Sequence, residues 1–248
     1  MRIFVTGPSR CGTTLVREVV IGLKIAQFHC SGANKEEDRS FFLYKELPEN
    51  YMTKLPVPHS SNITSGYTLE NFIKYMKRYK DLHAIFSFRH PVDACMSKIV
   101  RGQKASRGGD REFEKRSPDS YVPTAISAVK FATSIYKEFK KIFPGRLLAV
   151  KMEHLILSPD AEVKRIADFL GAEVTKESLL FYKYNSNVYQ YMRYGSKLDT
   201  SQIDVYERWQ TAYGGFFKNR EDDIKKLKEA FKNWVHPGPN IPYREMKE

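Results

Sequence analysis

The segment Gly7-Pro8-Ser9-Arg10-Cys11-Gly12-Thr13-Thr14 has the glycine spacing of a phosphate-binding loop. Thr13 stands where such loops carry the lysine that reaches the β- and γ-phosphates of a nucleoside triphosphate. Backbone N–H groups before a helix, two threonine hydroxyls and the Arg10 guanidinium remain. The loop therefore predicts a site for one phosphate-sized anion and speaks against nucleoside-triphosphate hydrolysis.

A second candidate anion site begins at Arg89, which follows the apolar segment HAIFSF at 83–88. Ser97 comes eight residues later, in a predicted helix whose first position is Pro91. Ligands of open α/β sheets bind at the carboxyl ends of strands, where Arg89 is expected. Two such sites together predict a ligand that carries phosphate groups at two separate places.

Each candidate site lies between a predicted strand and a predicted helix. Short apolar runs predict strands at 2–6, 51–56, 83–88 and 146–150. Apolar residues at helical spacing predict helices at 15–25, 69–79, 122–143 and 159–170, the last with Ser158 as N-cap. Strands that alternate with helices predict an α/β fold with a central parallel sheet covered by helices on both faces.

The remaining segments predict a long loop at 102–118 and a mostly helical C-terminal third. Beyond Gly171 only helical patterns occur, at 176–182, 201–213 and 221–234. The sequence shows no linker-like stretch, low-complexity run or internal repeat. We therefore expect residues 1–248 to form a single domain.

The bulk composition is that of a basic, globular chain. Its 248 residues include 41 Lys and Arg against 29 Asp and Glu, a formal net charge of +12. This charge attracts anions, so nucleic acid, anionic lipid, a phosphorylated cofactor and an acidic polymer are candidate partners. A hydrophobic share of 42% excludes a disordered chain.

Cysteine usage and apolar run lengths indicate the compartment. Cys11, Cys30 and Cys95 are odd in number and irregularly spaced, which fits neither a disulfide framework nor a zinc site. No apolar run approaches the roughly 18 residues of a membrane helix, and the N-terminus lacks the apolar region of a signal peptide. These features predict a cytoplasmic protein.

Three segments resemble the sulfotransferases that use 3′-phosphoadenosine 5′-phosphosulfate (PAPS). They are RCGTT at 10–14, RHPVDACMS at 89–97 and KMEHLILSPDAEVKRIADFLG at 151–171, with a weaker similarity in GSKLDTSQIDVYERW at 195–209. The resemblance implies that the first loop holds the 5′-phosphosulfate and that Arg89 and Ser97 hold the 3′-phosphate. The donor-binding residues it implies are Arg10, Cys11, Gly12, Thr13, Thr14, Arg89, Ser97, Ser196 and Lys197.

The same resemblance implies the chemistry. Arg10 is expected to act in catalysis as well as in donor binding, and sulfuryl transfer in this family needs no metal. The acceptor would be a hydroxyl of a sugar, a glycolipid, a small alcohol or a peptide. The sequence does not choose among these acceptors.

The sequence departs from the family pattern in three places. Ser9 stands where many members have proline, and Met152 where many have a tyrosine that helps to hold the adenine. Lys54-Leu55-Pro56 lacks the histidine of the cytosolic branch. The chain is more similar to the branch that contains the bacterial and tyrosylprotein sulfotransferases, which implies a glutamate base after the first helix.

Glu36 and Glu37 lie in that region, and either could take the proton of the acceptor hydroxyl. His29 and His59 are the next candidates for this base.

Two other classes of function remain open at the level of sequence. A P-loop kinase-like phosphotransferase would turn over Mg²⁺-ATP, although Thr13 in place of lysine speaks against it. A basic nucleic-acid-binding protein would bind oligonucleotides in a salt-sensitive way, with no dependence on a donor nucleotide.

Overall fold

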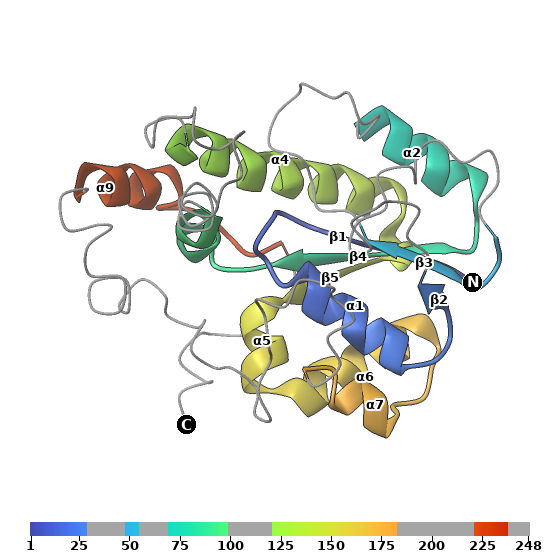
Figure 1. The fold of residues 1–248 in the computed structure, drawn as a ribbon. Coiled ribbons are helices and arrows are strands. Elements are labelled where there is room, and N and C mark those ends of the chain that lie inside the picture. The colour runs from blue at the N-terminus through green and yellow to red at the C-terminus, as the bar shows by residue number, and fades with distance from the viewer. Residues whose placement is uncertain (29–47, 55–68, 99–120, 183–220, 238–248) are drawn as a thin grey trace, which may run out of the picture.

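The computed structural model describes residues 1–28, 48–54, 69–98, 121–182 and 221–237. Within them, five parallel strands form one sheet in the order β2-β3-β1-β4-β5 (Figure 1). The strands are β1 (Arg2–Thr6), β2 (Gln27–Phe28), β3 (Tyr51–Lys54), β4 (Leu82–Phe88) and β5 (Leu147–Lys151). The chain leaves central β1 toward β2 and β3 and then continues at β4 on its other side. Ligands of such sheets bind at this reversal, at the carboxyl ends of the strands.

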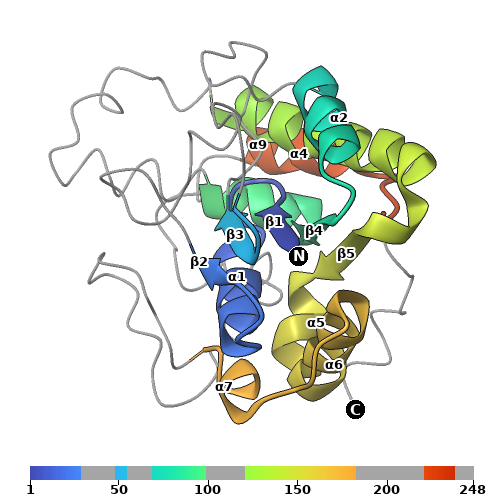
Figure 2. The same ribbon diagram turned by 90° about the vertical axis from the view of Figure 1, so that its right-hand side faces the viewer.

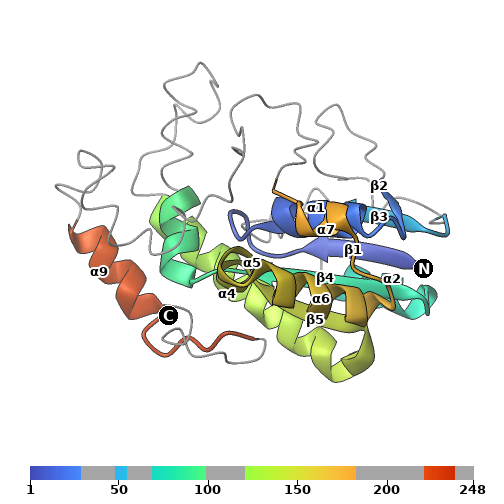
Figure 3. The same ribbon diagram turned by 90° about the horizontal axis from the view of Figure 1, so that it is seen from below.

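Helices cover both faces of the sheet (Figures 1 and 2). One face carries α1 (Thr13–Gly22), α5 (Met152–Leu157), α6 (Pro159–Leu170) and α7 (Lys176–Leu179), which Figure 3 shows over the sheet. The other face carries α2 (Leu69–Arg78) and α4 (Tyr121–Ile142), and α9 (Glu221–Ala230) packs beside α4. The predicted α/β class is confirmed.

The strands divide their side chains between two cores, as the two-residue period of a strand requires. Phe4, Phe86 and Phe88 face the core under α2 and α4. Val5 and Ile85 face the core under α1, α5 and α6. A strand buried on both faces is a continuous apolar run, which is why β1 and β4 are recognisable in the sequence.

Most predicted elements are present with bounds that agree within three residues, and the helix predicted at 221–234 ends at Ala230. α6 has the predicted bounds, and Gly171 ends it in the left-handed conformation at φ 63°. Ser158 occupies the N-cap as predicted, although its hydroxyl makes no capping hydrogen bond. The helix predicted at 176–182 ends at Leu179.

Three short elements were missed, namely β2, α5 and the 3-10 helix η3 (Pro144–Arg146), and two predictions concern residues outside the described ranges. β2 has two residues and α5 has six, which is too few for either period to show. The loop predicted at 102–118 and the helix predicted at 201–213 lie outside the part of the chain that the structure describes. Among the helices it does describe, none has the length and apolar character to cross a membrane.

Candidate functional site

The loop after β1 is packed directly against β4. Gly7 has φ 141°, and a Cβ at this position would lie 2.1 Å from the Ser87 carbonyl oxygen. The Ser87 hydroxyl in turn donates a hydrogen bond to the Cys11 carbonyl. Only glycine permits this approach, so the loop is held against the neighbouring strand.

The loop then turns into α1 through two left-handed residues, Arg10 at φ 72° and Gly12 at φ 81°. The left-handed conformation costs a residue such as Arg10 about 1–2 kcal/mol. Strain of this kind persists where the surroundings enforce it, and it concentrates at ligand sites. Cys11 N–H donates to the Pro8 carbonyl at 3.3 Å and closes the turn.

The N-terminus of α1 is suited to an anion. Gly12 is its N-cap, with no side-chain capping hydrogen bond, and the first turn contains no acidic residue. An α-helix leaves its first N–H groups without intrahelical acceptors, and its dipole makes this end positive. A Cβ at Gly12 would lie 2.9 Å from the Met152 side chain, so Met152 packs directly against the loop. The loop from Gly7 to Thr14, hereafter the cradle, thus has a geometry suited to an anion, and its binding of a phosphate group stays a prediction.

Lys54 brings a cation to this cradle from another strand. It is the last residue of β3, is 2% exposed, and is paired in register with Val5 of β1. Its Nζ donates a hydrogen bond to Thr14 Oγ1 at 3.1 Å. The loop itself has Thr13 where a lysine would stand. The lysine beside the loop, Lys54, comes from 40 residues beyond Thr14 in the chain. In the sequence, Lys54 stands out only for the histidine absent beside it, so this placement was not predicted.

The two predicted anion sites adjoin. Arg10 Nε donates to Ser97 Oγ at 3.1 Å, and Arg89 Nη1 contacts the Arg10 carbonyl at 3.4 Å. Arg89 is 2% exposed at the end of β4, and Ser97 lies in the helix at 91–98. The ends of β1, β3 and β4 therefore assemble Arg10, Lys54 and Arg89 in one place.

The cysteines near this site are packing groups. Burial raises the pKa of the Cys11 thiol, although Arg89 opposes the shift, and burial raises the pKa of Cys95 to about 12. Thiols that stay protonated are poor nucleophiles and poor ligands. Cys11 therefore contributes to the loop through its backbone.

Several candidate residues lie outside the described ranges, namely Glu36, Glu37, His29, His59, Ser196 and Lys197. Their roles stay predictions. Among the residues that the structure does describe, no cluster of His, Cys, Asp or Glu could hold a metal ion.

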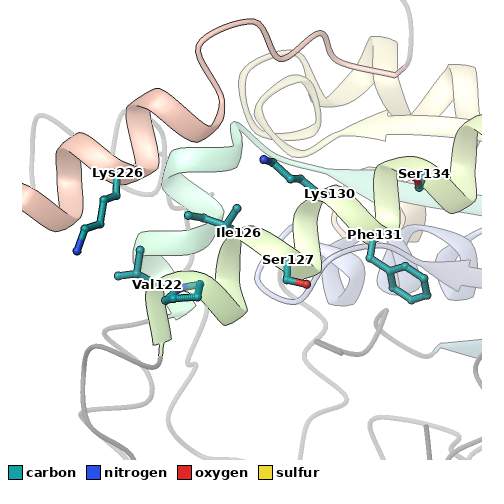
Figure 4. A pocket seen from close by; sticks show the side chains of 8 residues that line it. Val122, Ile126, Ser127, Lys130, Phe131, Ser134 and Lys226 are labelled. Carbon is teal, nitrogen blue, oxygen red and sulfur yellow. The ribbon is translucent and has the colours of Figure 1, made fainter. Parts of the chain in front are cut away.

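A groove of about 610 Å³ lies elsewhere, on the exposed side of α4 beside α9 (Figure 4). Val122, Ile126 and Phe131 supply apolar lining, and Lys130 and Lys226 supply charge. None of its lining residues belongs to the cradle or to the ends of β3 and β4. The groove is therefore a separate feature from the anion site.

Solved structures with the same fold carry a sulfotransferase activity in their names. A sulfotransferase domain from the curacin biosynthetic pathway is 16% identical over 93% of this chain and 96% of that chain, with a TM-score of 0.57. The sulfotransferase domain of the Synechococcus PCC 7002 olefin synthase is 15% identical over 98% and 96%, with a TM-score of 0.59. Mouse sulfotransferase SULT7A1, in complex with PAP, is 14% identical over 92% and 88%, with a TM-score of 0.56.

The sequence comparison is more specific than the fold. The sequence profile of the sulfotransferase family matches residues 19–176, more than half of the chain. The chain therefore belongs to the sulfotransferase family and is a sulfotransferase enzyme. A comparison with curated protein sequences finds no match.

Proposed function

We propose that this sulfotransferase takes PAPS as donor and transfers the sulfuryl group to a hydroxyl of an acceptor. The observation that carries the proposal is the meeting of Arg10, Lys54 and Arg89 around the loop at the ends of β1, β3 and β4. A donor with a 5′-phosphosulfate and a 3′-phosphate presents anions at two places. The site offers a helix N-terminus for one and a buried arginine with a nearby serine for the other.

The residues of the cradle fit such a donor. The close approach of Gly7 to β4 holds the loop as a fixed backbone surface for the 5′ end. Arg89 and Ser97, at 2% exposure and partial exposure, suit a 3′-phosphate. Met152 occupies the position of the adenine-holding tyrosine and packs against Gly12, so any adenine contact it makes is apolar.

We assign the stabilisation of negative charge during the reaction to Arg10 and Lys54, the two cations nearest the loop. The donor, when bound, supplies an activated sulfuryl group. Arg10 and Lys54 lie where they can donate to oxygens whose negative charge grows as the bond to sulfur breaks. Fixed donors of this kind stabilise the transition state more than the ground state.

The acceptor hydroxyl loses its proton as its oxygen bonds to sulfur and the donor's phosphate oxygen leaves. We propose Glu36 or Glu37 as the base, on the resemblance to the tyrosylprotein branch alone. A positioned base contributes about 10²–10⁴-fold to rate. Glu36→Gln and Glu37→Gln, each assayed at saturating donor, test this assignment, and near-normal kcat in both would move the base elsewhere.

The function as a whole is tested by nucleotide selectivity. Isothermal titration should give micromolar-scale binding of 3′-phosphoadenosine 5′-phosphate, which corresponds to about −8 kcal/mol. AMP, which lacks the 3′-phosphate, should bind at least about tenfold more weakly, since Arg89 contributes a charge-assisted contact to the first nucleotide only. Equal affinity for the two nucleotides would contradict a 3′-phosphate site at Arg89 and Ser97.

A further inference from the structure

Glu153 is a buried carboxylate beside the carboxyl end of β4. It is the second residue of α5 and is 1% exposed. The last residue pair of the β4–β5 ladder is Phe88 with Lys151, so the chain two residues past each strand brings Glu153 beside His90. Glu153 Oε1 accepts a hydrogen bond from the His90 backbone N–H at 2.7 Å.

His90 lies in the chain between Arg89 and Ser97, the two residues that suit a 3′-phosphate. Arg89 precedes it, and its carbonyl accepts the Ala94 N–H at 2.9 Å, which begins the helix at 91–98. Ser97 lies seven residues beyond His90, about two helical turns. A hydrogen bond that fixes the backbone at His90 therefore sets the direction in which the chain leaves β4 at Arg89. It also sets where the helix that carries Ser97 begins.

The carboxyl group serves here as a hydrogen-bond acceptor in either protonation state. Burial raises the pKa of Glu153, and the bond from His90 N–H and the charge of Arg89 oppose that rise. Its second oxygen, Oε2, has no hydrogen-bond partner within the described part of the chain. A protonated carboxyl group keeps a carbonyl oxygen that can accept the His90 N–H.

We propose that Glu153 is a positioning residue for recognition of the donor's 3′-phosphate, acting through its hydrogen bond to His90. This inference rests on the proposed PAPS-binding function. Glu153 itself makes no contact with the donor in this proposal. Its effect reaches the ligand through the placement of Arg89 and Ser97.

The test compares two substitutions that keep the volume of the side chain. Glu153→Gln retains an oxygen acceptor for the His90 N–H, and Glu153→Met removes it. Titration calorimetry with 3′-phosphoadenosine 5′-phosphate and with AMP gives the ratio of the two Kd values. Glu162, also buried at 4% exposure and bound by Arg165, provides the matched control pair Glu162→Gln and Glu162→Met.

We expect Glu153→Met to lower the selectivity for the 3′-phosphate about tenfold, the value of one well-placed hydrogen bond. AMP affinity should stay within about twofold, because AMP does not use Arg89. Glu153→Gln should restore the wild-type ratio, and both Glu162 variants should keep it. A Glu153→Met protein with wild-type selectivity, or a Glu153→Gln protein as unselective as Glu153→Met, would overturn the proposal.

Two further outcomes are separated by the same design. If the wild-type protein itself does not distinguish the two nucleotides, the proposed donor fails before the role of Glu153 is reached. If Glu153→Met does not fold, Glu153→Gln decides. Wild-type selectivity with slow hydrogen exchange at the His90 amide supports the proposal, and lost selectivity overturns it.

Discussion

The two ends of the parallel sheet both gather basic side chains, but the groups that bind those side chains differ. At the amino end, Arg2 Nη1 donates to both carboxylate oxygens of Asp81 at 2.7 Å. Arg146 donates to the carbonyls of Met76, Tyr79 and Lys80 at 2.7 to 3.0 Å. These cations are bound by a carboxylate, by a carbonyl in the last turn of α2 and by two carbonyls just after that helix.

At the carboxyl end, the hydrogen bonds of the cations include neutral hydroxyl and carbonyl acceptors, and the charge of Arg89 also acts on the buried carboxyl group of Glu153. Arg10 donates to the Ser97 hydroxyl, Lys54 to the Thr14 hydroxyl, and Arg89 to a carbonyl at 3.4 Å. The N-terminus of α1 adds further positive potential at this end.

The difference follows from the connectivity of a parallel α/β sheet. Each strand runs toward the N-terminus of the next helix, and each helix returns to the amino end of the sheet. The negative C-terminal ends of helices therefore gather at the amino edge of the sheet and bind its arginines. The C-terminal end of α2 binds Arg146 in this way. Positive helix ends gather at the carboxyl edge, where added cations favour an anionic ligand. The same residue types thus stabilise the fold at one end and, in the proposed function, hold the donor at the other.

The largest effect should come from Lys54→Met. Removal of one preorganised donor at a transition state typically costs about 10²–10³-fold in kcat. The free energy of unfolding should change by about 1 kcal/mol, the typical contribution of a hydrogen bond such as the one from Lys54 to the Thr14 hydroxyl. Steady-state rates at saturating donor, together with urea unfolding, give both quantities. A variant that unfolds easily but keeps full kcat would place Lys54 with the structural cations instead.

Arg146→Met should give the opposite pattern. Its guanidinium binds one carbonyl in the last turn of α2 and two just after that helix, so its loss should destabilise the protein by about 2 kcal/mol. The kcat of the folded protein should be unchanged, since the two ends of the sheet are separate. Urea unfolding and the same rate assay measure the two effects. A tenfold loss of kcat at full folding would show that the two ends are coupled.

The smallest effect should come from Asp81→Asn. Burial opposes ionisation of Asp81, but the hydrogen bond and charge of Arg2 outweigh it and lower the pKa of Asp81. A carboxyl with a lowered pKa stabilises the fold above its unfolded pKa, near 3.9, and the contribution is lost as pH falls through the folded value. The Asp81 side chain is 40% exposed, so solvent screens the pair and limits the gain to below about 1 kcal/mol.

The pH dependence of unfolding tests this pair. Wild type should be more stable than Asp81→Asn at pH 7 by this small margin, and the difference should vanish below about pH 3. A margin that grows toward acid pH would contradict a lowered pKa.

Local sequence patterns predicted those parts of the fold whose burial is local. β1 and β4 are apolar runs because both of their faces are covered, and α6 has its Pro159 start and its Gly171 stop within one segment. The same local patterns do not predict β2 and α5. The conformation of β2 depends on the strand that pairs with it, and that of α5 depends on the strand that directly precedes it. Short elements of this kind are set by tertiary contacts rather than by periodicity.

The candidate site divides in the same way. The cradle from Gly7 to Thr14 is a contiguous motif and could be predicted, as could Arg89 with Ser97. Lys54 could not, because its position depends on the register of β3 against β1, which joins residues about 50 apart. The contact between Arg10 and Ser97 spans 87 residues and was likewise beyond any local pattern.

The approach of Gly7 to the Ser87 carbonyl also limits how this enzyme can change its donor. The cradle and the segment that carries Arg89 follow adjacent, paired strands about 4.8 Å apart, and Gly7 lies directly against the second of them. Position 7 admits no side chain, so it offers no variation on which selection could act. On the proposed donor site, directed evolution toward another donor nucleotide would therefore find its useful changes at Arg89, Ser97 and Lys54, where the side chain alone can vary while the backbone stays in place.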